Sequence, residues 1–218
     1  MPVRKIRPNY SSLTGRLVSW KPGEEVDFES SLERDFAFLL EMDKYVEKYT
    51  VQPVKILFKD EESRSRSYTP DFLVHYHPEL KLSKNMRPCI FEVKYREDLK
   101  KDWDKLKPKF KAAISYAKEH DSVFKIVTER EIRSDRMSNS KFLHRFLRSE
   151  HEFDMEMNLL NKIINLKEST AQKLVDCMSN DPVERGKYLH ILWHMVAHER
   201  IYVDLNKKLT MTSILWHQ

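Results

Sequence analysis

Apolar and polar residues alternate in four short stretches of the N-terminal part of the chain, as they do in strands with two different faces. These stretches are residues 51–58, 68–76, 91–95 and 122–129. Helical spacing of apolar residues predicts one helix that begins at Ser30 or Ser31 and another at 97–119. The order helix, three strands, helix and strand predicts an α/β fold, a mixed sheet flanked by helices.

The helix predicted at 97–119 has one apolar and one charged face. Pro108 is expected to kink or restart it, because proline cannot donate a backbone hydrogen bond. The apolar face consists of Leu99, Trp103, Leu106, Phe110, Ala113, Ile114 and Ala117. The charged face carries Lys100, Lys101, Lys105, Lys107, Lys109 and Lys111. We interpret the charged face as solvated; the alternative is that it holds a DNA backbone.

Toward the C-terminus the pattern becomes mainly helical. Residues 131–140 are polar and basic, which predicts a crossing between domains, and Ser169 and Asp181 are expected to cap helices. Helices are predicted at 152–166, 169–178 and 182–198. The segments IYVDL and LTMTSILW then alternate as two strands around the turn NKK. Helices followed by a hairpin predict a winged-helix-like domain, which gives two domains, 1–131 and 132–218.

Residues 1–29 are polar and irregular in pattern, which predicts either an arm along DNA or a partner, or a frayed terminus. Its basic residues are Arg4, Lys5, Arg7 and Arg16. Over 218 residues, Lys and Arg number 39 and Asp and Glu 34, a small excess that fits contact with a polyanion without establishing it.

No apolar run approaches the roughly 18 residues of a membrane span, and the N-terminus has no hydrophobic core for export. We therefore expect a cytoplasmic protein. Cys89 and Cys177 lie far apart without a CxxC pattern, which indicates neither a disulfide framework nor a zinc ribbon.

Candidate chemistry lies on two of the predicted strands. Glu92 and Lys94 are two positions apart, so the acid and the amine share one face of their strand. Asp71 follows Pro70 where the chain enters the preceding strand. We therefore expect the Asp71 carboxylate at the sheet edge beside Glu92.

Two carboxylates and a lysine in this pattern are typical of metal-dependent DNA cleavage. Asp71 and Glu92 offer hard oxygen ligands to a divalent ion, and the backbone carbonyl of Val93 is a third candidate. Such an ion neutralises charge and activates water, while Lys94 orients or helps to deprotonate the water, or stabilises the phosphate. The alternative is that Pro70 and Asp71 form a simple turn, and Glu92 and Lys94 an ordinary ion pair.

The PD motif at 70–71 followed by ExK at 92–94 resembles the PD-(D/E)xK nuclease superfamily of restriction endonucleases and Holliday-junction resolvases. Upstream, the run S-x-x-E-R-D-F-x-x-L-L-E-x-D and the later Q-P resemble TnsA, the endonuclease family of the heteromeric Tns transposases of bacteria. The resemblance implies a restriction-endonuclease-like sheet and places the catalytic positions of the family on Glu33, Asp71, Glu92 and Lys94. Some members have glutamine at the position of Glu92.

The resemblance also implies a function. The protein would nick double-stranded DNA at the 5′ ends of a transposable element and so complete its excision, with Mg²⁺ as cofactor and Mn²⁺ as a substitute. A TnsB-like transposase would cut and join the 3′ ends, and the C-terminal domain would dock a TnsC-like AAA+ ATPase. Two other hypotheses stay open: a stand-alone restriction- or resolvase-like nuclease, and a non-catalytic adaptor between DNA and the ATPase.

Structural explanations also exist for other candidates. Glu33 lies three residues after Ser30 and fits a capping box, which needs no metal. An accessory acid is the lesser hypothesis for Glu129, which lies at the end of the last predicted strand. A zinc site is the lesser hypothesis for three histidines on one helical face, because no nearby cysteine or acid completes the ligand set: His190, His194 and His198.

Overall fold

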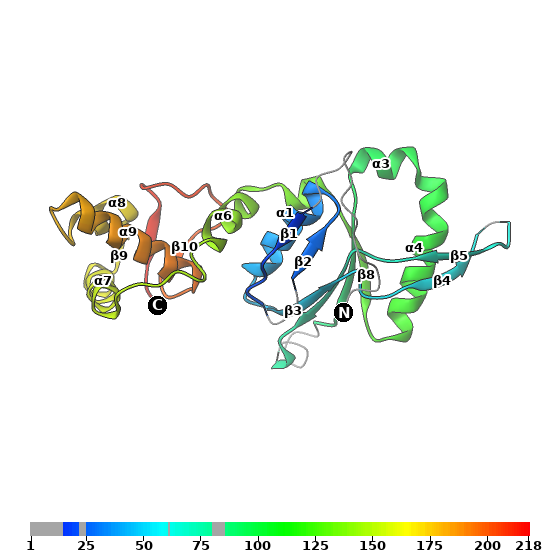
Figure 1. Ribbon diagram of the computed structural model, residues 1–218, viewed down its shortest axis with the longest axis horizontal. Helices are drawn as coiled ribbons and strands as arrows, with labels where there is room; N and C mark the ends of the chain where they lie inside the picture. Colours follow the sequence, from blue (N-terminus) through cyan, green and yellow to red (C-terminus); the bar gives the residue numbers. More distant parts are fainter. Residues whose placement is uncertain (1–14, 22–24, 61, 80–85) are drawn as a thin grey trace. The chain divides into compact units, whose positions relative to one another are not determined.

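The computed structural model describes residues 15–21, 25–60, 62–79 and 86–218 (Figure 1). The chain divides into two compact units, 1–133 and 134–218. Three of the four basic residues of the predicted N-terminal arm, Arg4, Lys5 and Arg7, lie outside the described residues. Within the described residues, no helix is long and apolar enough to cross a membrane.

A four-stranded mixed sheet forms the centre of the N-terminal unit. Its strands are β3 (Val46–Val51), β6 (Phe72–Tyr76), β7 (Cys89–Val93) and β8 (Val123–Val127), in the order β3-β6-β7-β8. The β3–β6 and β6–β7 pairs are antiparallel, whereas β7 and β8 are parallel. Every residue of β7 is buried, because this strand has neighbours on both sides and helices on both faces.

Two helices cover opposite faces of this sheet (Figure 1). On one face, Phe36 of α1 (Ser31–Glu41) packs against the paired residues Phe72 and Phe91, with ring centroids 5.2 and 5.1 Å away. On the other, Phe110 of α4 (Trp103–Glu119) packs against Phe124 at 5.7 Å. The α/β fold, a mixed sheet flanked by helices as in restriction endonucleases, is therefore confirmed.

Two hairpins extend the N-terminal unit. Residues 1–29 are not irregular throughout, since β1 (Gly15–Leu17) pairs with β2 (Val26–Phe28). The strand predicted at 51–58 is right only in part. β3 ends at Val51, Gln52 turns the chain with a positive φ of 45°, and the predicted residues from Ile56 onward belong to β4 (Ile56–Lys59). β4 forms a hairpin with β5 (Ser65–Tyr68).

The helix predicted at 97–119 is two helices. The break lies at Asp102, between α3 (Arg96–Lys101) and α4, whereas Pro108 lies inside α4. Trp103 and Ile114 were expected in the apolar face and are exposed. The short helix α5 (Glu129–Ile132) follows β8 and begins with a capping box formed by Thr128 and Glu131.

The C-terminal unit combines helices with a three-stranded antiparallel sheet, as expected of a winged-helix-like domain. The helices are α6 (Asp135–His144), α7 (Phe153–Leu166), α8 (Ala171–Asp176) and α9 (Pro182–Ala197). The strands, in the order β10-β11-β9, are β9 (Glu168–Thr170), β10 (Tyr202–Val203) and β11 (Ile214–Trp216).

Of the two helix caps predicted in this unit, one is confirmed and the other is wrong. Asp181 caps α9 by accepting hydrogen bonds from the backbone N–H groups of Val183 and Glu184, as predicted. Ser169 does not cap α8, because it lies in β9 and the cap is Thr170. The crossing predicted at 131–140 contains the division between the two compact units, after residue 133, although most of these residues belong to α5 and α6.

Candidate active site

Asp71 lies where β6 begins, and three hydrogen bonds fix it to the neighbouring strands. Its Oδ2 atom accepts from the backbone N–H of Val93 at 2.7 Å. Its own N–H donates to the carbonyl of Phe91 at 3.1 Å, and its carbonyl accepts from Gln52 at 2.8 Å. The carboxylate therefore lies against the end of β7, as the sequence predicted.

Glu92 is the penultimate residue of β7, and its side chain is buried toward α4. Only 2% of the residue is exposed, so its charge requires strong partners. The Oε2 atom accepts a hydrogen bond from the Tyr68 hydroxyl at 2.6 Å, and Oε1 accepts one from the Lys109 ammonium at 2.9 Å. Both carboxylate oxygens are thus held by side chains from outside the sheet.

Lys94 lies on the same side of the strand as Glu92. Its Nζ atom is 3.8 Å from Glu92 Oε1, which allows electrostatic attraction but exceeds hydrogen-bond distance. With 36% of its side chain accessible, Lys94 is only partly buried. The direct ion-pair partner of Glu92 is therefore Lys109, and Lys94 remains available for another role.

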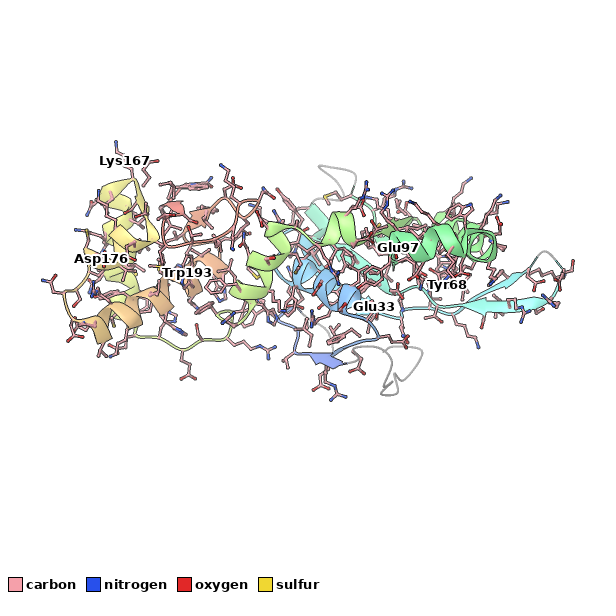
Figure 2. All side chains as sticks on the ribbon, turned by 90° about the horizontal axis from the view of Figure 1, so that it is seen from above. Glu33, Tyr68, Glu97, Lys167, Asp176 and Trp193 are labelled. Atoms are coloured by element: carbon pink, nitrogen blue, oxygen red, sulfur yellow. The ribbon has the colours of Figure 1, made fainter. Side chains whose placement is uncertain are left out.

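Glu33 lies in the first turn of α1 (Figure 2), where it takes part in capping. The Ser30 hydroxyl accepts from the Glu33 N–H at 3.1 Å and donates to its Oε1 atom at 2.9 Å. Oε2 accepts from the backbone N–H of Glu29 at 2.9 Å. The capping interpretation of Glu33 thus has direct support, and this geometry does not test the catalytic one.

The three acids form one electrostatic cluster. Burial, followed by the charges of Glu92 and Glu33, raises the pKa of Asp71 well above its usual range, and Lys94 opposes this. Burial is also the main cause of the raised pKa of Glu33. Carboxylates that repel one another in a poorly solvated place are stabilised by a cation, so the donor set fits a divalent metal ion.

This donor set is not a complete protein cage. Within the described part of the chain, no three His, Cys, Asp or Glu side chains converge as a metal-binding group. A divalent ion held by Asp71 and Glu92 would need further ligands from the backbone or water. Such incomplete coordination by protein is usual for Mg²⁺, which retains several waters.

Two residues at the site were not predicted, namely Tyr68 and Lys109. The sequence predicts Lys109 on the charged outer face of its helix, yet only 19% of its side chain is accessible. Its spacing contained the signal, because it lies three residues after Leu106 and four before the buried Ala113. Tyr68, at the end of β5, gave no comparable signal.

Two other candidates have structural partners. Glu129 accepts a hydrogen bond from the backbone N–H of Arg96 at 3.0 Å, which lowers its pKa and secures the start of α3. His194 lies beside His198 and His151, with ring centroids 4.4 and 4.2 Å away. The described residues contain no three-ligand group there, so the zinc hypothesis gains no support.

Comparison with known families agrees with the residue pattern. Residues 43–129 match the family model described as TnsA-like endonuclease N terminal. Residues 131–205 match the model described as TnsA endonuclease C terminal. No curated protein matches the chain significantly. The two matches cover most of the chain and meet close to the division between its two compact units.

Proposed function

Because the chain belongs to the TnsA family of Tn7-like transposase endonucleases, we propose that it nicks DNA at the 5′ ends of a transposable element and so completes excision. The observation that carries this proposal is the meeting of Asp71, Glu92 and Lys94 at the ends of β6 and β7. Two carboxylates and a lysine at one sheet edge suit hydrolysis of a phosphodiester.

Endonucleases of this family generally depend on a divalent metal. We propose Mg²⁺, for which Mn²⁺ can substitute, held by Asp71, Glu92 and the backbone carbonyl of Val93. When bound, the ion supplies charge neutralisation and a water of lowered pKa. Asp71 is suited to this role because its hydrogen bond to Val93 fixes one oxygen and orients the other.

Lys94 and Glu33 complete the proposed catalytic set. The Lys94 ammonium, held close to Glu92 without a direct hydrogen bond to it, would orient the attacking water or stabilise the scissile phosphate. Glu33 interacts electrostatically with both Asp71 and Lys94, which supports a place at the site in addition to its capping role.

The proposed partners divide between the two units. The N-terminal unit would act on the double-stranded transposon ends beside a TnsB-like transposase that processes the 3′ ends. The C-terminal unit, which matches its own TnsA model, would dock a TnsC-like AAA+ ATPase. Its compactness supports a separate task, because a unit with its own core can present a docking surface.

Strand-resolved cleavage of a labelled transposon end in Mg²⁺ tests this function. The wild-type protein is expected to nick the 5′ strand when its candidate transposase and ATPase are present. Asp71→Ala should reduce nicking by about 100-fold or more, because a metal ligand contributes about 3 kcal/mol to transition-state stabilisation. Circular dichroism serves as the control for folding.

Three other results would contradict the proposal in different ways. Cleavage by the protein alone would favour a stand-alone nuclease. Absence of cleavage in every combination would favour a non-catalytic adaptor. Full nicking by Asp71→Ala would remove the proposed site even if the activity itself were correct.

A further inference from the structure

We propose that Tyr68 and Lys109 form a clamp that positions the Glu92 carboxylate for metal binding. This inference rests on the proposed function, because it assigns a role to residues around the same site. Neither residue belongs to the PD or ExK motif, and the two come from β5 and α4. They are positioning residues, since they act through Glu92.

The clamp engages the carboxylate from two directions. The Tyr68 hydroxyl is 2.6 Å from Oε2, and the Lys109 ammonium is 2.9 Å from Oε1. A carboxylate offers about four lone-pair directions, two on each oxygen. One hydrogen bond to each oxygen fixes the plane of the group and leaves one acceptor direction on each oxygen for a metal ion.

Lys109 is itself held in place. Its Nζ atom lies 4.6 Å from the centre of the Tyr68 ring and 5.2 Å from that of Phe110. A cation over aromatic rings is stabilised by their electron-rich faces. The ammonium thus contacts both members of the Tyr68–Glu92 pair, so the three groups behave as one unit.

Tyr68 is the donor in this arrangement. An ionised carboxylate can only accept, so the hydrogen bond of 2.6 Å to Oε2 uses the proton of the Tyr68 hydroxyl. A carboxylate that accepts from such a donor cannot rotate without losing a short, charge-assisted hydrogen bond.

The elements that carry the clamp pack against each other. Tyr68 shares a small core with Ile56 of β4 and Ala113 of α4. Phe110, next to Lys109, lies edge-on to the Tyr68 ring at 6.4 Å. Figure 2 shows Tyr68 at the base of the β4–β5 hairpin beside α4. The clamp is thus anchored by the hairpin and α4, whereas Asp71 is anchored by the strands.

The competing explanation is that the clamp only neutralises a buried acid. That role predicts a loss of stability in variants but unchanged metal affinity and turnover once they are folded. Positioning predicts weaker metal binding and slower turnover in the folded variants. Substituting a residue that holds a metal ligand typically changes affinity or activity by about 10- to 100-fold. The two explanations are therefore separable by measurement.

The experiment uses the full chain with its proposed partners and compares Tyr68→Phe and Lys109→Met with wild type. Mn²⁺ binding is followed by electron paramagnetic resonance, and kcat and KM for nicking are measured separately. Both variants should bind Mn²⁺ about 10- to 100-fold more weakly and lose kcat rather than raise KM for DNA. Lys109→Arg should restore part of the loss, since it keeps a cationic donor.

Matched controls are available on the same helix. Lys118→Met removes an exposed lysine of α4, and Tyr116→Phe removes a hydroxyl beside the same small core. Neither should alter Mn²⁺ affinity. Wild-type affinity and kcat in both clamp variants would overturn the clamp, whatever their melting temperatures. Unimpaired cleavage by Asp71→Ala in the same assay would instead overturn the proposed function.

Discussion

Two buried glutamates of the N-terminal unit accept similar hydrogen bonds from tyrosine but differ in their other partners. Glu41 is 3% exposed and accepts from the Tyr49 hydroxyl at 2.6 Å. Its carboxylate also accepts from the Ser19 hydroxyl at 2.5 Å and the Trp20 N–H at 2.7 Å. These donors connect α1 to β3 and to the segment after β1, so Glu41 ties three parts of the unit together.

Glu92 has the same tyrosine contact, 2.6 Å from Tyr68, but its surroundings are charged. Lys109 and Lys94 lie on one side of it, and Asp71 is close enough for the charge of Glu92 to raise the pKa of Asp71. The three donors described for Glu41 are neutral, and they distribute its charge over hydrogen bonds that connect parts of the fold. Glu92, in contrast, has a second carboxylate and two lysines around it, an arrangement that suits the binding of a metal ion.

Burial of a glutamate in this unit therefore does not by itself indicate a functional role. Both glutamates are buried and both have a tyrosine partner, so neither property marks the active site. The distinguishing features are the second carboxylate and the lysine that lacks a hydrogen bond to its nearest acid. Substitutions around Glu92 should accordingly lower the rate of nicking, whereas substitution of Glu41 should lower stability.

The largest effect is expected for Lys94→Ala, which should lower the rate of 5′-strand nicking by about 100-fold or more, about 3 kcal/mol of transition-state stabilisation. Stability should hardly change, because Lys94 is partly exposed and its 3.8 Å contact with Glu92 is not a hydrogen bond. Single-turnover cleavage and thermal melting measure the two quantities.

Lys48→Ala, at an exposed lysine of β3, is the matched control. It should leave the nicking rate near that of wild type. If Lys94→Ala melted well below wild type and cut at the normal rate, Lys94 would have to be grouped with structural residues, and the contrast with Glu41 would disappear.

The next effect is expected for Glu41→Gln, which should destabilise the N-terminal unit by about 2 kcal/mol, because hydrogen bonds to a charged acceptor are stronger than those to an amide. For a chain of this size the first melting transition should fall by about 4–8 °C. Differential scanning calorimetry measures this shift.

Nicking per folded molecule should remain normal in Glu41→Gln, since Glu41 contacts none of the proposed catalytic residues through the bonds described for it. Active-site titration of the folded fraction at low temperature checks this point. A loss of nicking comparable to that of Lys94→Ala would show that Glu41 and Glu92 belong to one functional network.

The arrangement of Asp71, Glu92 and Lys94 was predictable because it is local. Pro70 before a strand and the two-residue spacing of Glu92 and Lys94 determine position and face with no knowledge of the tertiary fold. Asp71 accordingly lies against β7, and Lys94 lies near Glu92. Periodicity within each element likewise predicted α1, α4, β6, β7 and β8, but not the β1–β2 hairpin or most of β3.

Contacts between distant elements were not predictable in this way. The bond between Tyr68 and Glu92 depends on how the β4–β5 hairpin packs on α4, which no local spacing contains. The break between β3 and β4 was missed because the turn at Gln52 interrupts a run of alternating residues. The cap at Thr170 was missed because pairing with β11 takes Ser169 into a strand.

A third buried glutamate extends the comparison to the C-terminal unit. Glu156 is 3% exposed and is bonded to His151 at 2.7 Å and to Arg200. His151 in turn lies against His194, whose Nδ1 atom is 2.9 Å from the carbonyl of Phe146. Here the surroundings include histidines and an arginine in place of lysines and a second carboxylate.

The smallest effect is expected from His194. Burial is the main cause of its lowered pKa, and neighbouring His198, His151 and His190 add to it against the hydrogen bond to Phe146. A histidine whose pKa is lower in the folded state favours folding fully above its ordinary value of 6.5. That contribution is lost as the pH falls from about 6.5 through the lowered pKa.

Hydrogen exchange of the α9 amides, corrected for intrinsic rates, should therefore show weaker protection at about pH 5.5 than at about pH 7.5. His194→Asn keeps an amide donor near the position of Nδ1 but cannot titrate, so its protection should change less between the two conditions. An equal change in both proteins would assign the pH dependence to groups other than His194. A smaller change in the variant would place a pH-sensitive contact in the C-terminal unit, at the hydrogen bond between His194 and the carbonyl of Phe146.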